Sequence, residues 1–170
     1  MPTPKANAMK SKINLVERYR QSQLEWNAAL AGLRPADYER MVYRRWRLKD
    51  IQGHVLSYLQ LSQRHICTYL KSKRLASPRA PTYSYFNRRE AERLKNVPFA
   101  QLRGEMEAAF ADLFDLLPAL KDEDLRRVFP SQWWNSKYNT TLRSILREDA
   151  EHIRIHAADV VKWRQGLERG

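Results

Sequence analysis

Three histidines have the residue type and spacing that could bind a metal ion. His152 and His156 lie four residues apart in Glu151-His152-Ile153-Arg154-Ile155-His156, and His54 lies far earlier in a chain that has only 4 histidines. Imidazole is a common protein ligand for zinc, nickel and iron near neutral pH. In a helix the four-residue spacing places both rings on one face, one turn apart. A third ligand from a facing helix would leave one coordination position open, as in catalytic zinc sites.

Carboxylates close to these histidines are candidates for a supporting role. Asp50 and Asp149 stand four and three residues before a histidine of the set, and Glu148 and Glu151 lie beside the second pair. A carboxylate so placed can orient a ligand ring by accepting its hydrogen bond, or can accept a proton during catalysis. The alternatives are a helix cap for Asp50 and solvent exposure for Glu148 and Glu151. No single residue is identified as catalytic by this spacing.

His65 and Cys67 have simpler interpretations. His65 follows His54 by eleven residues, about 16 Å along a helix, so it cannot share the same metal ion. We interpret it as a packed or surface histidine. Cys67 is the only cysteine, which excludes an internal disulfide and a cysteine-rich metal site. Its spacing from neighbouring apolar residues indicates a small buried side chain rather than a reactive thiol.

Tryptophans are the other side chains that could shape a site. Trp133 and Trp134 are adjacent in an aromatic segment and would either border a pocket or simply pack as large apolar rings. Trp26 and Trp46 are more simply explained as core residues.

The elements that must position the histidines are helices. Residues 11–33 form a predicted first helix with Asn14 and Glu17 as a capping box. A second begins at residues 46–50 and runs to about 72, with His54 in its first turns. Its apolar stripe consists of Ile51, Val55, Leu59, Ile66 and Leu70. Prolines at 78 and 81 end that helical pattern.

The second half of the chain shows the same periodicity. Asn87 and Glu90 indicate a short helix to about residue 95, and a third long helix starts near Pro98 and ends before Pro118. Residues 122–129 form a further turn. The final helix spans about 140–165, and alternating steps of three and four place both of its histidines on the apolar face. That face consists of positions 142, 145, 149, 152, 156, 160 and 163.

Long amphipathic segments without a convincing strand pattern predict an all-α fold. We expect a four-helix bundle over residues 11–166 with a long connection between helices two and three. Residues 1–10 are expected to be a disordered N-terminal tail and 167–170 a C-terminal tail. A chain of 170 residues fits one domain of this kind.

Composition restricts the partners and the compartment. The formal net charge of +12 attracts anions and raises the question of nucleic acid, but basic residues are spread over several segments and no zinc-finger or RNA-recognition motif accompanies them. A small-molecule substrate is therefore the leading partner, with nucleic acid and a homodimer as alternatives. Without a signal-peptide pattern or a long apolar run, we expect a cytoplasmic protein and no membrane partner.

Three stretches carry a resemblance to a known family. Trp46-Arg47-Leu48-Lys49-Asp50-Ile51-Gln52-Gly53-His54 is similar to a "W-x-L-K-D-x-x-x-H" helix start, and the segment from Asp149 to Asp159 is similar to an "E-H-x-x-x-H" helix. Tyr85-Phe86-Asn87-Arg88-Arg89-Glu90 resembles an aromatic-Asn segment, with Phe86 where Trp is commoner. Over residues 11–166 the chain thus resembles the damage-inducible DinB-like (YfiT-like) superfamily, and within it the ClbS/DfsB branch.

This resemblance implies a site and a range of functions. In metal-binding members three histidines hold a divalent ion, and those roles fall on His54, His152 and His156. The implied activity is that of a metal-dependent transferase or hydrolase, in which a low-molecular-weight thiol or water reacts with an electrophile during detoxification or stress response. Some members of the branch lack the histidines. The alternative is therefore a binding or sequestering protein, including one that contacts DNA through its basic surface, or a bundle whose histidines are only core residues.

Overall fold

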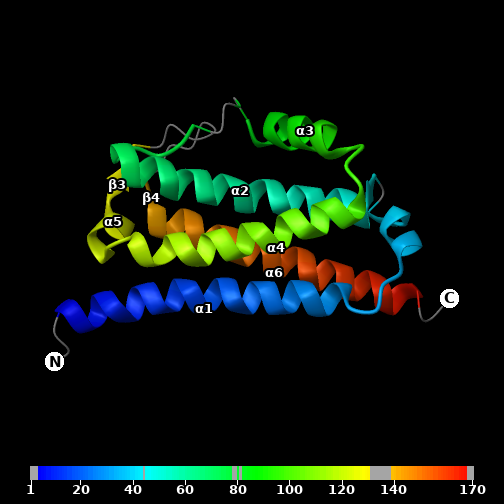
Figure 1. Ribbon diagram of the computed structural model, residues 1–170, viewed down its shortest axis with the longest axis horizontal. Helices are drawn as coiled ribbons and strands as arrows, with labels where there is room; N and C mark the ends of the chain where they lie inside the picture. Colours follow the sequence, from blue (N-terminus) through cyan, green and yellow to red (C-terminus); the bar gives the residue numbers. More distant parts are fainter. Residues whose placement is uncertain (1–3, 44, 78–79, 81, 131–138, 168–170) are drawn as a thin grey trace.

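The computed structural model describes residues 4–43, 45–77, 80, 82–130 and 139–167. Its body is a bundle of long helices, which confirms the predicted all-α class (Figure 1). The long helices are α1 (Pro4–Leu30), α2 (Leu48–Ser72), α4 (Phe99–Leu116) and α6 (Leu142–Leu167). The connection between α2 and α4 is long, as expected, and carries the shorter helix α3 (Tyr83–Leu94).

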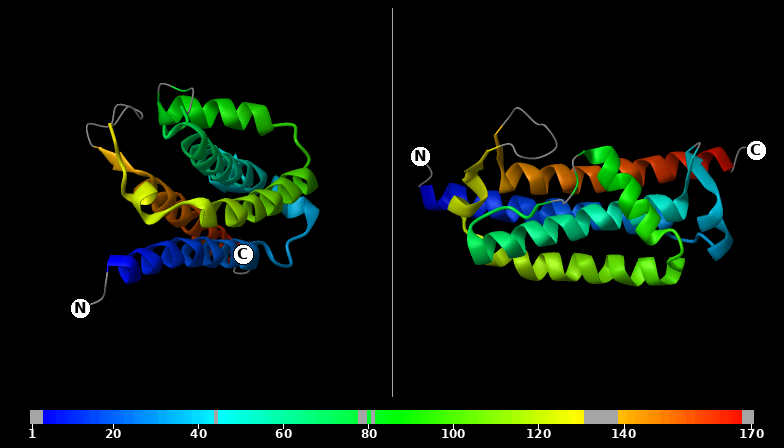
Figure 2. Two further views of the ribbon diagram at one scale, coloured as in Figure 1. Left: turned by 60° about the vertical axis from the view of Figure 1, so that its left-hand side comes forward. Right: turned by 90° about the horizontal axis from the view of Figure 1, so that it is seen from above.

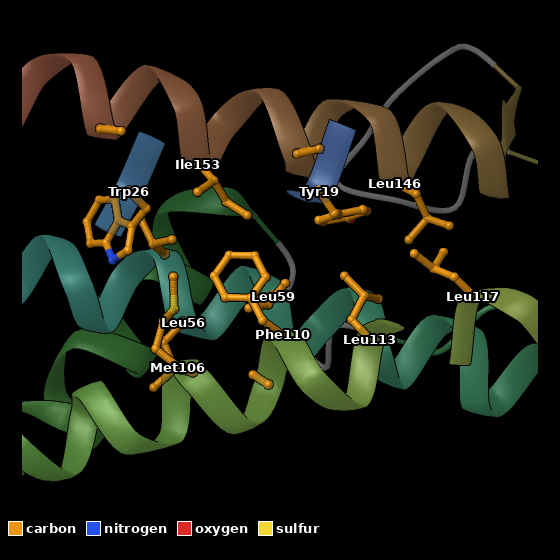
Figure 3. Packing of buried hydrophobic residues seen from close by; sticks show 14 of the residues in the cluster. Tyr19, Trp26, Leu56, Leu59, Met106, Phe110, Leu113, Leu117, Leu146 and Ile153 are labelled. Carbon is orange, nitrogen blue, oxygen red and sulfur yellow. The ribbon is translucent and has the colours of Figure 1, made fainter. Parts of the chain in front are cut away.

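Apolar side chains from all the long helices meet in one core. Figure 3 shows Tyr19 and Trp26 of α1 with Leu56 and Leu59 of α2 and residues of α4 and α6. The stripe expected on α2 is buried, apart from Leu70, which is partly exposed. Removing this apolar surface from water is the main force that assembles the bundle. The α4 side chains in the core are Leu102, Met106, Ala109, Phe110 and Leu113.

The start of α1 differs from the sequence-based expectation. Residues 4–10, expected to be a disordered tail, are helical, and Asn14 lies inside the helix rather than capping it. Pro4 is compatible with a helix start because a residue in the first turn needs no amide hydrogen bond. The Asn14 side chain instead accepts a hydrogen bond from Arg18 Nε at 2.7 Å. The α1 face that packs includes Leu15, Tyr19, Trp26 and Ala29, whereas Leu24 is exposed.

A short hairpin precedes α2 and was missed by the sequence analysis. Strands β1 (Met41–Tyr43) and β2 (Trp46–Arg47) pair antiparallel, and a 3-10 helix, η1 (Pro35–Glu39), precedes them. The hairpin is anchored where Leu48 N donates to Arg40 O at 3.0 Å. Strands of two or three residues carry too little alternation to be recognised in a sequence. The hairpin brings Tyr43 and Trp46 to the end of the bundle where α2 begins.

Helix α3 lies on the outside of α2, on the side away from α1 (Figure 2). It begins at Tyr83, four residues before the expected start, because the Thr82 hydroxyl caps it by accepting from Tyr85 N at 3.1 Å. The two helices approach closely at Gly53, where a side chain would meet Leu94 Cδ1 at 3.1 Å. A glycine in α2 thus permits the contact.

The remaining elements close the far end of the bundle. They are η2 (Leu117–Ala119), α5 (Asp122–Arg126), β3 (Val128–Phe129) and β4 (Thr140–Thr141), with β3 and β4 paired antiparallel. The adjacent pair Trp133 and Trp134 lies outside the described residues. Over the described part of the chain, no helix is both long and apolar enough to span a bilayer.

Candidate metal centre

The three histidines singled out in the sequence converge on one point. His54 comes from the first turns of α2, and His152 and His156 come from α6. His152 Nε2 lies 3.0 Å from the Nε2 of His54 and 3.0 Å from the Nε2 of His156. Candidate ligand atoms of the three residues all lie within 4.8 Å of one another. The expected convergence of distant segments is therefore present.

These distances are compatible with a shared metal ion as well as with hydrogen bonds. Ligand nitrogens at zinc–nitrogen bond length around a tetrahedral ion are roughly 3.3 Å apart, close to the two separations of 3.0 Å. A neutral imidazole nitrogen either donates one proton or accepts, so His152 Nε2 can donate to only one of its two neighbours. A cation at the common point would satisfy all three lone pairs. The donor set therefore suits a divalent ion that accepts imidazole ligands.

The electrostatic setting keeps the rings neutral. Burial, followed by the proximity of the other two histidines, lowers the pKa of His54 to about 3. Burial and the nearby His156 lower the pKa of His152 to about 4. Burial also lowers the pKa of His156, although Asp159 opposes that shift. Neutral imidazole is the form that binds metal, so the site has its ligands ready at neutral pH.

Tyr43 and Asp159 support His156 from the side away from the other histidines. The Tyr43 hydroxyl lies 3.3 Å from His156 Nδ1 and donates a short hydrogen bond to Asp159. Asp159 Oδ2 itself is 3.7 Å from the same ring nitrogen. Burial, with the neighbouring Asp159, raises the pKa of the Tyr43 hydroxyl, so it stays protonated and keeps donating. Because the Tyr43 proton is donated to Asp159, the phenol oxygen is left to accept from His156 Nδ1, and the tautomer that donates there presents its Nε2 lone pair to the common point.

Aromatic rings enclose His54 and His152. The Trp46 ring lies edge-on to His54 at a centroid distance of 4.8 Å, and Tyr58 lies 4.8 Å from His152 and 5.0 Å from His54. The Tyr58 hydroxyl donates to Asn87 Oδ1 on α3 at 2.9 Å. Trp46 thus borders the site and, being partly buried, also packs against the bundle core, whereas Trp26 is fully buried in the core as expected.

The predicted supporting carboxylates lie elsewhere. Asp50 accepts a hydrogen bond from Arg47 N at 2.9 Å and pairs with the Arg47 guanidinium. It therefore caps the start of α2, which was the alternative to a supporting role at the histidines. Burial acts to raise the pKa of Asp50, but the hydrogen bonds from Arg47 outweigh it and the pKa is lowered. Within the described ranges no hydrogen bond joins Asp50 to a site histidine.

Asp149 faces α1 instead of the histidines. Its Oδ2 accepts from the Tyr19 hydroxyl at 3.0 Å in a fully buried position. Burial raises the pKa of Asp149 to about 6, against the opposing hydrogen bonds of Ser62 and Tyr19. His152 Nδ1 is buried without a hydrogen-bond partner among the residues described. Asp149 therefore does not orient the His152 ring.

The other candidate residues are separate from the cluster. His65 is buried and is not part of the histidine group, as expected. Cys67 is partly exposed rather than buried. Glu151 pairs with Arg154 at 3.2 Å, and Glu148 is exposed. The supporting residues that sequence reasoning missed are Tyr43, Asp159 and Tyr58; only Asp159, one turn after His156, left a local signal.

Comparisons with known proteins show what this architecture is similar to. The sequence matches no protein-family model and no curated protein. Among solved structures, DfsB, described as a sibling lethal factor precursor, has 16% identity and a TM-score of 0.75, covering 92% of this chain and 96% of its own. An uncharacterised protein from Escherichia coli UTI89 has 12% identity and a TM-score of 0.75, with 92% and 94% covered.

A mycothiol-dependent maleylpyruvate isomerase shares the same fold. It has 12% identity and a TM-score of 0.72, and the match covers 88% of this chain but only 60% of the isomerase. At these identities the likeness establishes the fold alone. The structural neighbours thus include DfsB and a mycothiol-dependent isomerase, and the shared fold confirms the resemblance seen in the sequence at the level of the fold.

Proposed function

We propose that this chain, with the fold that DfsB and the isomerase share, binds a divalent metal ion through His54, His152 and His156 and acts on a small molecule. The observation that carries the proposal is the convergence of three Nε2 atoms from α2 and α6 at separations suited to a common ion. The fold supplies the positions but not the activity, which depends on the site itself.

The chemistry would be that of an activated nucleophile. When bound, a divalent ion with three neutral ligands leaves a position open and makes a water or thiol there more acidic, so that a nucleophile exists near pH 7. Tyr43 and Asp159 fix the His156 ring and keep its proton on Nδ1. Trp46 and Tyr58 exclude water from the sides of the cluster. These residues therefore position the ligands rather than react.

The reaction class follows from that nucleophile. Attack by water would hydrolyse a reactive electrophile, and attack by a low-molecular-weight thiol would transfer the thiol to it. The name of the isomerase neighbour, which states dependence on mycothiol, supports the thiol route in this fold. A cytoplasmic role in detoxification or stress response fits both routes. The second candidate remains a binding protein that sequesters such an electrophile without metal chemistry.

Metal content tests the first step. Protein purified without added metal is analysed for zinc, nickel and iron, beside His54→Ala, His156→Ala and His65→Gln variants whose folding is checked by circular dichroism. We expect about one ion per chain in the wild type and in His65→Gln, and loss of that ion in the other two. The proposal is wrong if the wild-type protein contains no metal, or if both His54→Ala and His156→Ala keep it. Because affinity order favours copper and zinc in most sites, the ion found need not be the native one.

A further inference from the structure

A cavity of about 260 Å³ lies beside the histidine cluster, between the start of α2, the hairpin and α3. His54 belongs to both, since its ring borders the cavity and its Nε2 meets the other histidines. The wall of the cavity also contains acidic and basic residues, the aromatic ring of Trp46 and the amide of Asn87. The residues used below are Arg45, Trp46, Lys49, Asn87, Arg88 and Lys95.

Lys49 is a buried cation in this wall. It is only 9% exposed, and its ammonium donates one hydrogen bond, at 3.3 Å, to the backbone carbonyl of Lys95. An ammonium has three protons to donate, so two remain. No carboxylate of the described chain lies within ion-pair distance of Lys49. Buried charges in proteins are normally paired, because desolvating an isolated charge is costly. The neighbouring Asp50 interacts with Lys49 electrostatically but is itself bonded to Arg47, so the ammonium keeps protons to donate to a group in the cavity.

The rest of the wall has an excess of positive charge. Arg45 and Arg88 are exposed at the cavity and form no ion pair with any residue that the structure describes. The two acids of the wall are already engaged, since Asp50 pairs with Arg47 at 2.8 Å and Glu92 with Lys95 at 3.5 Å. An excess of one sign of charge around a cavity concentrates ligands of the opposite sign. The uncompensated groups are therefore the cations.

We propose that this cavity binds a carboxylate or phosphate group of the small-molecule substrate, with Lys49 as its main contact and Arg45 and Arg88 at the rim. The inference rests on the proposed function, because it names the class of substrate that the metal site would act on. The anionic end would occupy the cavity, and the reactive end would extend past His54 to the histidine cluster.

The size of the cavity restricts that group. Cavities for whole drug-sized ligands are usually about 300–1,000 Å³, so this one suits a small anion or the end of a larger molecule. Asn87 and the edge of Trp46 complete its wall, and Asn87 is held by the hydrogen bond from Tyr58. The cavity thus combines a buried charge with fixed polar and aromatic surface, as specific anion sites do.

Isothermal titration calorimetry with simple anions tests the proposal. Inorganic phosphate, succinate and neutral succinamide are titrated into the full chain, both as purified and after metal removal, at low salt. We expect saturable binding of at least one anion and none of succinamide. Binding of phosphate alone would identify a phosphate group, and binding of succinate alone a carboxylate. If neither anion binds, the proposal is wrong.

Substitutions locate the binding. Lys49→Met should weaken the anion affinity by about tenfold or more, the usual effect of losing a hydrogen bond to a charged group. Lys71→Met, on the exposed surface of the same helix, should bind like the wild type. Arg45→Gln with Arg88→Gln changes only exposed residues and should weaken binding about twofold to tenfold. If either cavity variant binds the anion as tightly as the wild type, the inference is wrong. If Lys49→Met does not fold, the anion affinity of the double arginine variant provides the test.

Metal analysis of the same samples separates this inference from the proposed function. Lys49→Met should contain as much metal as the wild type, because Lys49 is not a ligand. Protein that holds histidine-dependent metal but binds no anion contradicts only the anion site. Protein that binds the anion through Lys49 without any histidine-dependent metal contradicts only the metal site.

Discussion

At the scale of single residues, His156 is the histidine whose orientation the structure explains most fully. Its Nε2 faces His152, and its Nδ1 faces the hydroxyl of Tyr43, which in turn donates to Asp159. Partners of this kind fix the tautomer and the ring angle of a metal ligand and raise its basicity. A phenol and a carboxylate thus act together on one ligand.

Removing the Tyr43 hydroxyl should weaken metal binding without unfolding the chain. For Tyr43→Phe and for Asp159→Asn we expect about 10-fold to 100-fold lower metal affinity, the usual effect of losing such a partner. Competition with a chromophoric chelator measures the affinity. Tyr85→Phe, which removes the hydroxyl of an exposed tyrosine on α3, serves as the matched control. Wild-type affinity in both site variants would show that these residues do not hold the ligand.

Asp149 makes a pH-dependent contribution to stability. Its pKa in the folded chain, about 6, is above the ordinary value because the carboxyl is buried. The folded state therefore holds the proton more tightly than the unfolded state. Protonated Asp149 therefore adds to the free energy of unfolding. Its contribution is complete below the unfolded-state pKa of about 4 and is lost as the pH rises through about 6.

Asp149→Asn should consequently stabilise the protein at alkaline pH. The amide can still accept from Tyr19 but carries no charge, so we expect about 1–3 kcal/mol of added stability at pH 8 and little or none near pH 4. Urea unfolding across that pH range measures the difference. Asp115→Asn, on the exposed face of α4, is the control. A stability difference that does not grow with pH would contradict the raised pKa.

Spacing identified the three histidines, but not the residues that support them. Two rings four residues apart on an apolar face, and one ring early in another amphipathic helix, are local patterns, and the bundle brings them together. Tyr43 belongs to a connector with no periodicity, and its contact with Asp159 joins positions 116 residues apart. Contacts of that kind depend on tertiary packing, which a single sequence does not show.

At the scale of elements, the approach of α3 to α2 forms the proposed anion cavity. Gly53 sits where the two helices touch, and a methyl group there would lie 3.1 Å from Leu94 Cδ1. Because Gly53 and Leu94 also line the cavity, the helix contact and the cavity share a wall. The spacing of the helices thus fixes the width of the cavity.

A larger residue at position 53 should force the helices apart. Gly53→Val should destabilise the chain by about 1–3 kcal/mol through overpacking, although a glycine within a helix is itself unfavourable. In a Leu94→Ala background the same change should be less harmful, and denaturant unfolding of the four proteins measures that coupling. If the effects of Gly53→Val and Leu94→Ala on the free energy of unfolding are additive, positions 53 and 94 do not limit how closely α2 and α3 approach.

The long helices were predictable, as were the short helix α3 and the turn that forms α5, but the short strands and several helix ends were not. The stripes on α2 and α4 follow the helical period over many residues, so their burial and approximate ends were predicted from sequence. The start of α1, the Thr82 cap of α3 and the β1–β2 hairpin each depend on a few residues. Such boundaries are decided by local hydrogen bonds and tertiary contacts, which compete with weak sequence preferences.

At the scale of the whole molecule, the net charge of +12 is the property that favours a nucleic-acid alternative. Several of the basic side chains are already paired with carboxylates on the surface, including Arg47, Arg93 and Arg154. We therefore expect duplex DNA to bind only non-specifically, with a Kd of about 10⁻⁴–10⁻⁶ M that weakens steeply as salt rises.

A salt titration of duplex binding by fluorescence anisotropy measures that expectation. Two duplexes of unrelated sequence should bind the protein with similar affinity at low salt, and both should dissociate over the same range as the salt concentration rises. Sequence-selective binding that is tighter than about 10⁻⁸ M at physiological salt would instead support the DNA-contacting alternative.

The proposed function requires one ion at the point where α2 and α6 bring their histidines together. Anomalous diffraction from crystals of the purified protein, recorded at the absorption edge of the metal found in it, locates that ion. We expect a single strong peak about 2.0–2.1 Å from the Nε2 atoms of His54, His152 and His156. A stoichiometric metal bound elsewhere, or no peak between these three rings, would contradict it.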